Sequence, residues 1–292
     1  MTSSMPRSKS SEVERAPRLS FGDFTLLSRF IYEECGIKMP AAKKTMLEAR
    51  LQKRLRALGM RSFLEYCAYL FGNSGGDELV RMIDLATTNK TDFFREADHF
   101  AFLAQRALPE WRQRYGKGGA KRLMVWSAGC SSGEEPYTLA MVLNEFAAGC
   151  ADFDYRILAT DICTQVLEKA QLAVYPEERI APVPPLLKRK YLLRSKDTSS
   201  GLVRVVPELR EKVRFRHLNL MAGDFGMHQP MDIIFCRNVI IYFDRPTQER
   251  LLNRLCAHLS PGGYLFMGHS ETLSGLDVPL TSVYPTVYRK VS

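Results

Sequence analysis

Beyond Lys121 the chain carries short apolar runs that alternate with helical patterns, and this alternation limits the possible folds more than any other feature. Four runs have the length and composition of buried strands, at 123–126, 155–159, 231–236 and 264–267. Helical patterns follow the first three runs, from 136 onward and at 165–172 and 247–259. Parallel strands need a crossover connection, which is usually a helix. The pattern therefore predicts an α/β domain with a doubly wound, Rossmann-like parallel sheet and helices on both faces.

The residues before this region have a helical pattern without a strand. Apolar residues recur at spacings of three and four from Phe21 to about Ala86, and Gly36 and Gly59 stand where two of the helices would end. We therefore predict a flexible polar segment at 1–19, a small all-α domain at 20–86 and an α/β domain at 87–292.

The β-α alternation lapses between Pro182 and Leu218. Two strand-like runs lie in this interval, at 201–206 and 212–216. Two such runs are typical of an antiparallel insertion, so we predict a β-subdomain at about 186–217.

Composition and charge narrow the classes of function. The chain has 292 residues and a formal net charge of +9. No apolar stretch approaches the ~18 residues of a membrane helix, and the first twenty residues lack the apolar segment of an export signal. The seven cysteines show no CxxC spacing, which indicates a reducing compartment, so we expect a cytoplasmic protein. The positive charge predicts an acidic partner, which can be nucleic acid, lipid or protein.

Most of the positive charge lies in the second predicted helix. Residues 43–61 hold seven basic side chains against one acid, Glu48. A charged run is often only a solvated face, but a run of nearly one sign is easier to explain if an acidic surface offsets its repulsion. The segment has no aromatic residue that would stack on bases.

The loop after the first predicted strand, at 127–136, stands where an α/β sheet binds a nucleotide-like ligand. Its glycines do not spell GxGxxG, and Glu134 and Glu135 at the helix start would repel a phosphate. Asp161 follows the next strand, where an acid accepts hydrogen bonds from ribose hydroxyls. These features favour S-adenosylmethionine, an adenosine ligand with a positive centre and no phosphate. The alternative is that the two glutamates only stabilise the helix N-terminus.

Five blocks of the sequence, in this order, resemble the CheR family of chemotaxis receptor methyltransferases. They are TTNKTDFFRE at 87–96, WSAGCSSGEEPY at 126–137, ATDI at 159–162, IFCRNVIIYF at 234–243 and GHSE at 268–271. The resemblance implies a helical N-terminal domain and a methyltransferase domain with an antiparallel β-subdomain. It also implies transfer of a methyl group from S-adenosylmethionine to glutamate side chains of bacterial chemoreceptors, giving γ-glutamyl methyl esters and S-adenosylhomocysteine.

The resemblance also implies roles for individual residues. Cofactor contacts would come from Asn89, Thr91, Arg95, Glu135, Asp161, Asn219, Leu220, Arg237 and Asn238. Arg95 would bind the methionine carboxylate, and Tyr242 would stand near the transferred methyl group. Receptor docking would use Arg50, Lys53 and Arg56. We expect no metal and no general base, because the glutamate acceptor is already ionised at neutral pH.

Two other functions stay open on the sequence alone. A nucleic-acid methyltransferase would also be basic and doubly wound, but the place of its [DNS]PP[YF] motif reads CRNV at 236–239. A non-catalytic adaptor would bind cofactor and receptor without transferring methyl. If the chain is a receptor methyltransferase, we expect a monomer that does not insert into membranes and does not bind nucleic acid. It would reach the membrane through its receptor.

Overall fold

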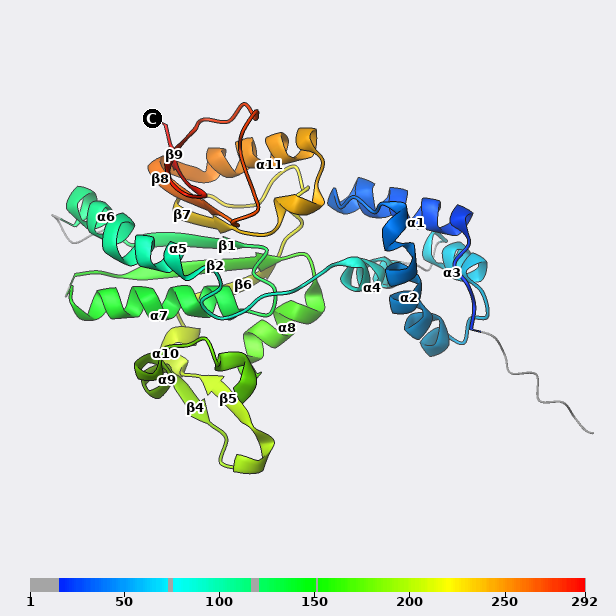
Figure 1. The fold of residues 1–292 in the computed structure, drawn as a ribbon, viewed down its shortest axis with the longest axis horizontal. Helices are drawn as coiled ribbons and strands as arrows, with labels where there is room; N and C mark the ends of the chain where they lie inside the picture. Colours follow the sequence, from blue (N-terminus) through cyan, green and yellow to red (C-terminus); the bar gives the residue numbers. More distant parts are fainter. Residues whose placement is uncertain (1–15, 73–75, 117–120, 151, 292) are drawn as a thin grey trace, which may run out of the picture.

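The computed structural model describes residues 16–72, 76–116, 121–150 and 152–291. A group of helices forms one end of the molecule and a larger α/β part forms the rest (Figure 1). Most of the predicted polar segment 1–19 lies outside the described residues. Within the described ranges, no helix combines the length and apolar composition needed to cross a membrane. The domain limits at 20–86 and 87–292 stay predictions.

Four α-helices and one 3-10 turn make up the N-terminal group. They are α1 (Phe21–Cys35), η1 (Ala41–Lys43), α2 (Lys44–Leu58), α3 (Phe63–Leu70) and α4 (Gly76–Ala86). The ends follow local chemistry, because Ser20 and Ser62 accept hydrogen bonds from the backbone N–H groups of Asp23 and Glu65. Gly36 closes α1 in the left-handed region, with φ +69°. The helices share one apolar core that includes Leu27, Leu47, Leu51, Phe63 and Met82.

The central sheet has seven strands in the order β6-β2-β1-β7-β8-β10-β9. The strands are β1 (Leu123–Ala128), β2 (Tyr155–Asp161), β6 (Val213–His217), β7 (Met231–Cys236), β8 (Leu259–Met267), β9 (Leu280–Tyr284) and β10 (Val287–Lys290). The first five strands of this set run parallel, and β10 is antiparallel to both β8 and β9. The predicted doubly wound parallel sheet is confirmed. The C-terminal antiparallel pair was not predicted.

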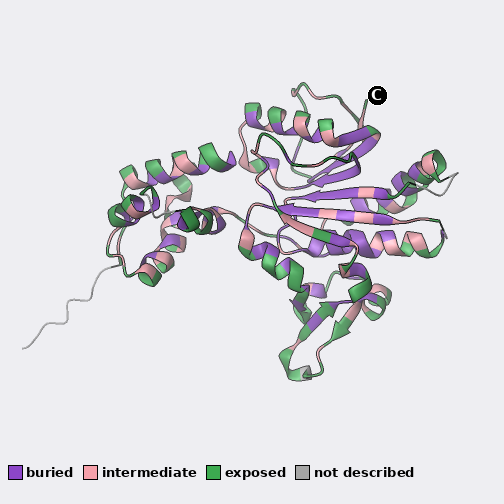
Figure 2. Ribbon diagram, turned by 180° about the vertical axis from the view of Figure 1, so that it is seen from behind, coloured by how far each residue is buried: buried purple, intermediate pink, exposed green. Residues whose placement is uncertain are grey.

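Alternate side chains of β1 and β7 enter two different cores. Val125, Ile233 and Phe235 face one core, and Trp126 and Ile234 face the other. The first core also contains residues of α5 (Ala97–Phe102), η2 (Leu103–Ala107), α6 (Leu108–Tyr115) and α7 (Glu134–Ala148). The second core is covered by α11 (Arg245–His258). Figure 2 shows the resulting band of buried strands between exposed helix surfaces, which explains why β7 is buried at every position.

A second, three-stranded antiparallel sheet projects on the α7 side of the molecule (Figure 1). Its strands are β3 (Val174–Pro176), β5 (Leu202–Val205) and β4 (Leu192–Arg194), in that order across the sheet. Helix α8 (Thr164–Leu172) precedes it, and η3 (Glu177–Ile180), α9 (Pro185–Tyr191), η4 (Thr198–Ser200) and α10 (Pro207–Arg210) complete the region. The predicted antiparallel β-subdomain is confirmed, although β3 lies before the predicted start at 186.

The placement of 212–216 in that β-subdomain is wrong. This run forms β6, which pairs in parallel with β2 at the edge of the central sheet, with Ile157 opposite Val213 and Asp161 opposite His217. Val213 and Phe215 alternate into the core beneath α7. A single strand with alternating apolar residues fits an antiparallel insertion and a sheet edge equally well, so its partner decides the outcome.

The strand order determines where this sheet can bind a ligand. The chain leaves β1 toward β2 and β6 and later returns to the other side of β1 with β7 and β8. In such a sheet, the loops after neighbouring strands diverge at this switch point and leave a crevice beyond the carboxyl ends.

Candidate functional site

A cavity of about 260 Å³ lies at this switch point. All ten residues predicted for cofactor binding or positioning line it: Asn89, Thr91, Arg95, Glu135, Asp161, Asn219, Leu220, Arg237, Asn238 and Tyr242. They come from the linker after α4, from the last residue of β2 and from the segments that follow β1, β6 and β7. The structure thus brings the whole predicted set together, while their roles stay predictions.

The β1 loop approaches the β7 loop very closely at Gly129. This glycine has φ +79°, and a Cβ there would lie 2.5 Å from Cγ2 of Val239. Any larger residue would push apart two walls of the cavity. Glycine is therefore needed at this position for both its backbone conformation and its lack of a side chain.

Glu135 and Arg237 form a buried ion pair beside the cavity. Nε of Arg237 donates to Oε2 of Glu135 at 2.7 Å, and Oε1 of Glu135 accepts from Ser127 at 2.7 Å. Nη1 of Arg237 also donates to the backbone carbonyl of Arg95 at 2.7 Å. Much of the Arg237 guanidinium is therefore committed to protein partners. Its observed contacts hold Glu135 and the linker in place.

Asp161 has a buried carboxylate held by backbone groups. It accepts from the N–H of Ser131 at 2.8 Å and from the N–H of Cys163 at 2.9 Å. Burial raises the pKa of Asp161, and these backbone hydrogen bonds oppose that increase. Each carboxylate oxygen can still accept a further hydrogen bond, so the group suits a ligand that offers hydroxyl donors.

The linker at 87–96 is attached to the loop after β1 and to η3. Ser131 donates its hydroxyl to the carbonyl of Asn89 at 2.9 Å, and Arg179 donates to the carbonyl of Thr91 at 2.6 Å. Nη1 of Arg95 donates to the carbonyl of Lys90 at 2.9 Å. The linker therefore contributes a wall with two cationic residues, Lys90 and Arg95, and the Arg95 guanidinium is partly tied to the linker's own backbone.

Asn219, in the segment after β6, uses its side-chain amide for hydrogen bonds within the protein. Asn219 donates from Nδ2 to the carbonyl of Glu34 at 2.6 Å and accepts from the N–H of Met221 at 2.8 Å. The amide thus joins α1 of the N-terminal group to the cavity wall. Leu220 supplies apolar surface on the same wall.

Glu271 was not predicted as a site residue, although it lies in the GHSE block. Its buried carboxylate accepts four backbone N–H groups, from Asn238, Ile240, Ile241 and Gly268, at 2.6 to 3.4 Å. Asn238 has φ +59°, in the left-handed region. A non-glycine residue in this region needs support from its surroundings. Glu271 supplies it, and so fixes the turn that leads to Tyr242.

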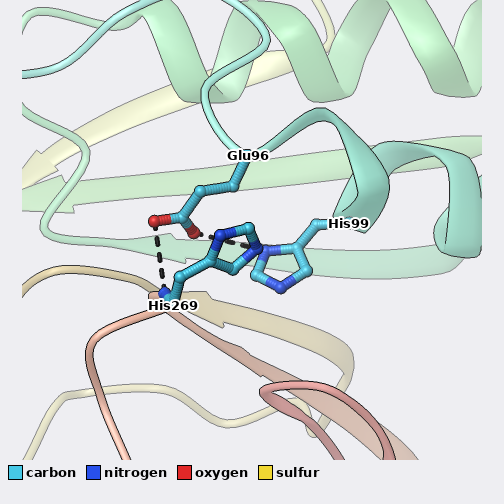
Figure 3. A group of neighbouring side chains, drawn as sticks. All are labelled: Glu96, His99 and His269. Carbon is cyan, nitrogen blue, oxygen red and sulfur yellow. Dashed lines mark hydrogen bonds and ion pairs between the residues drawn. The ribbon is translucent and has the colours of Figure 1, made fainter.

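Three titratable side chains, Glu96, His99 and His269, lie close together next to the site (Figure 3). Glu96, His99 and His269 place ligand-type atoms within 4.8 Å of one another. Nη1 of Arg237 lies 3.1 Å from Nδ1 of His99 and 3.3 Å from Oε2 of Glu96. A guanidinium can only donate, so Nδ1 of His99 accepts and Nε2 donates to Thr286 at 2.8 Å. The Arg237 guanidinium therefore occupies two of the three groups, Glu96 and His99.

Two family models match this chain. The all-alpha domain of the CheR methyltransferases matches residues 22–87, and their SAM binding domain matches residues 89–288. The chain belongs to the CheR methyltransferase family. It is therefore an S-adenosylmethionine-dependent methyltransferase, as the resemblance in sequence predicted.

Curated relatives of the family cover almost the whole chain. The chemotaxis protein methyltransferase of Escherichia coli strain K12 is 41% identical over 99% of this chain and 98% of its own length. The chemotaxis protein methyltransferase of Klebsiella aerogenes is 42% identical over 96% of this chain and 94% of its own length. The chemotaxis protein methyltransferase of Borreliella burgdorferi is 39% identical over 92% of this chain and 94% of its own length.

The residues of the cavity fit the family's cofactor. Glu135 and Asp161 offer carboxylates to an ammonium group and to ribose hydroxyls, and Arg95 offers a cation to a carboxylate. Leu218, Leu220 and Val239 add apolar surface for an aromatic ring. The absence of a phosphate-binding glycine pattern agrees with a nucleoside ligand that carries no phosphate.

The three predicted docking residues differ in their environment. Arg50 is half-buried, and its Nη1 donates to the carbonyls of Leu85, Ala86 and Thr87 at 2.7 to 3.2 Å. It therefore closes the C-terminal end of α4 at the start of the linker. Lys53 and Arg56 are exposed on α2.

Replacing Glu271 should damage the site through the backbone. Glu271→Gln puts an amide donor against N–H groups that need acceptors, so we expect the free energy of unfolding to fall by about 2 kcal/mol. Affinity for S-adenosylhomocysteine should also fall, by about tenfold, because Asn238 loses its support. Chemical denaturation and calorimetry measure the two effects. Glu168→Gln, on the exposed surface of α8, is the control, and unchanged values for both properties in Glu271→Gln would contradict the assignment.

His99 should resist protonation. Burial and the neighbouring Arg237 lower its pKa from 6.5 to about 4. The unfolded chain binds the proton more readily, so this group stabilises the fold fully above pH 6.5 and loses that contribution as the pH falls toward 4. The loss amounts to about 3 kcal/mol. Nitrogen chemical shifts of His99 should report a midpoint near pH 4, whereas a midpoint near 6.5 would show that Arg237 does not occupy its acceptor.

Proposed function

We propose that this chain methylates glutamate side chains of bacterial chemoreceptors and gives γ-glutamyl methyl esters. The main support is the cavity at the sheet's switch point, where the linker, the last residue of β2 and the segments after β1, β6 and β7 supply the predicted cofactor residues. The relatives named as chemotaxis protein methyltransferases over nearly the full chain support the choice of substrate. S-adenosylhomocysteine is the second product.

The chemistry requires positioning more than proton transfer. A free glutamate with a pKa near 4.3 is ionised about 500 to 1 at pH 7, so no general base is needed. When bound, S-adenosylmethionine supplies a methyl group on a positively charged sulfur. The new carbon–oxygen bond forms as the carbon–sulfur bond breaks, and the opposite charges of nucleophile and sulfonium cancel. In-line placement of the reacting atoms then provides much of the acceleration.

The chain's own residues have separate tasks in this proposal. Arg95 holds the cofactor carboxylate, Glu135 faces its ammonium group, and Asp161 accepts from ribose hydroxyls. Arg237 holds Glu135 in place through their buried ion pair. Tyr242 stands near the transferred methyl group and shields the reaction from water.

In this proposal, Lys53 and Arg56 of α2 bind the chemoreceptor. Both are exposed and form no ion pair among the described residues. Arg50 has a structural role in this proposal, because its Nη1 donates to three backbone carbonyls. A nucleic-acid substrate is disfavoured because residues 43–61 carry no aromatic side chain. The cytoplasmic location, the monomeric state and recruitment to the membrane through the receptor stay predictions.

The proposed reaction can be tested by transfer of a radiolabelled methyl group. Purified protein, labelled S-adenosylmethionine and receptor-containing bacterial membranes should give label on the receptor band that mild base releases as methanol. Label in RNA or DNA instead would contradict the proposal. Cofactor binding without any transfer, measured by calorimetry in the same preparation, would favour a non-catalytic adaptor.

Charge reversal on α2 should affect docking alone. The variant Lys53→Glu with Arg56→Glu should lower kcat/KM for receptor by about tenfold, because like charges would oppose an acidic partner. Its affinity for S-adenosylhomocysteine should not change. Lys169→Glu with Lys196→Glu makes the same change in net charge at other exposed positions and should retain activity. Equal loss in both variants would show that only net charge matters.

A further inference from the structure

Lys43 brings a positive charge from the helical N-terminal group into the cavity. It is the last residue of η1, and among the cavity-lining residues up to Ala86 it is the only charged one. Its Nζ lies over the ring of Tyr242, 5.1 Å from the ring centroid. Nothing in the family matches or in the sequence-based roles gives this side chain a place in the reaction.

The ammonium group of Lys43 has no anionic partner in the described part of the chain. No carboxylate oxygen lies within 4.0 Å of it, and it forms no hydrogen bond there, whereas neighbouring Lys44 pairs with Glu48 at 3.6 Å. Burial and the nearby Arg50 lower the pKa of Lys43. A half-buried cation without a partner is unfavourable, and an anion that enters the cavity would offset this cost.

The position of Lys43 suits an anion delivered along α2. Lys43 directly precedes this helix, and Lys53 lies ten residues further on, a distance of about 15 Å at the helical rise. A partner that docks on Lys53 and Arg56 therefore passes within reach of Lys43. Tyr242, which Lys43 contacts, is the residue expected nearest the transferred methyl group.

We propose that Lys43 binds the carboxylate of the substrate glutamate and orients it for attack. One carboxylate oxygen accepts a hydrogen bond from the ammonium group, and the other forms the bond to the methyl carbon. The carbon–sulfur bond breaks, its electron pair stays on sulfur, and no proton moves. The resulting ester is neutral and loses its attraction for Lys43, which favours product release. This inference rests on the proposed methylation of glutamate.

A binding experiment can separate this role from cofactor binding. The probe is a chemoreceptor cytoplasmic fragment with either glutamate or glutamine at one methylation site, bound in the presence of S-adenosylhomocysteine so that no reaction occurs. The native protein should bind the glutamate form at least about fivefold more tightly than the glutamine form. Lys43→Met, which keeps the length and removes the charge, should lose this preference, and Lys43→Arg should retain part of it. Lys44→Met is the matched control and should retain it fully.

Kinetic and cofactor measurements complete the test. Lys43→Met should lower kcat/KM for receptor by about tenfold or more, with no fall in melting temperature and no change in calorimetric affinity for S-adenosylhomocysteine. Weaker cofactor binding would show that Lys43 holds the cofactor carboxylate instead, and would overturn the inference. A preference for glutamate that persists in Lys43→Met would also overturn it. If the native protein forms no base-labile ester on receptors, the proposed function itself fails, which the labelling experiment detects without any variant.

Discussion

The buried ion pair between Glu135 and Arg237 is the interaction on which the site depends. It joins the start of α7, after β1, to the end of β7, and these two strands are neighbours at the point where the sheet reverses its order. Removing Arg237 would leave Glu135 buried without its counter-charge, which costs about 3 to 5 kcal/mol. The same guanidinium holds the linker at the carbonyl of Arg95. Three walls of the cavity therefore keep their places through one side chain.

The helical N-terminal group is also part of the cavity. Asp84 accepts hydrogen bonds from the backbone and hydroxyl of Thr164 at 2.8 and 2.6 Å, next to the start of α8. The carbonyl of Glu34 accepts from Asn219, and the N–H of Lys38 donates to the carbonyl of Tyr242. These bonds attach the helices to the segments after β2, β6 and β7. A partner bound to the helices is thereby held in a fixed position relative to the reacting atoms.

Local pattern predicted the strands and the acidic and polar residues at their ends, whereas the full set of cavity residues came from the family resemblance. Buried strands have continuous apolar runs, and polar residues that end them meet at one edge of a parallel sheet. The partner of β6 and the carbonyl contacts of Arg50 were not predictable in this way. Both depend on contacts between distant segments, and the carbonyls that Arg50 binds leave no trace in residue identity. Glu271 was missed for the same reason, because its partners are backbone N–H groups.

The structure divides the positive charge of residues 43–61 into three uses. Arg54 forms an ion pair with buried Glu78 at 2.6 Å, and Arg50 binds carbonyls, so both stabilise the helical group. Lys43 faces the cavity, and Lys53 and Arg56 face solvent. Salt screens exposed charges far more than buried ones. Raised ionic strength should therefore weaken an encounter that depends on the exposed pair, while the fold and the charges inside the cavity change little. Residues 43–61 thus serve two steps of the proposed function. The exposed Lys53 and Arg56 recognise an acidic partner, and Lys43 acts inside the cavity.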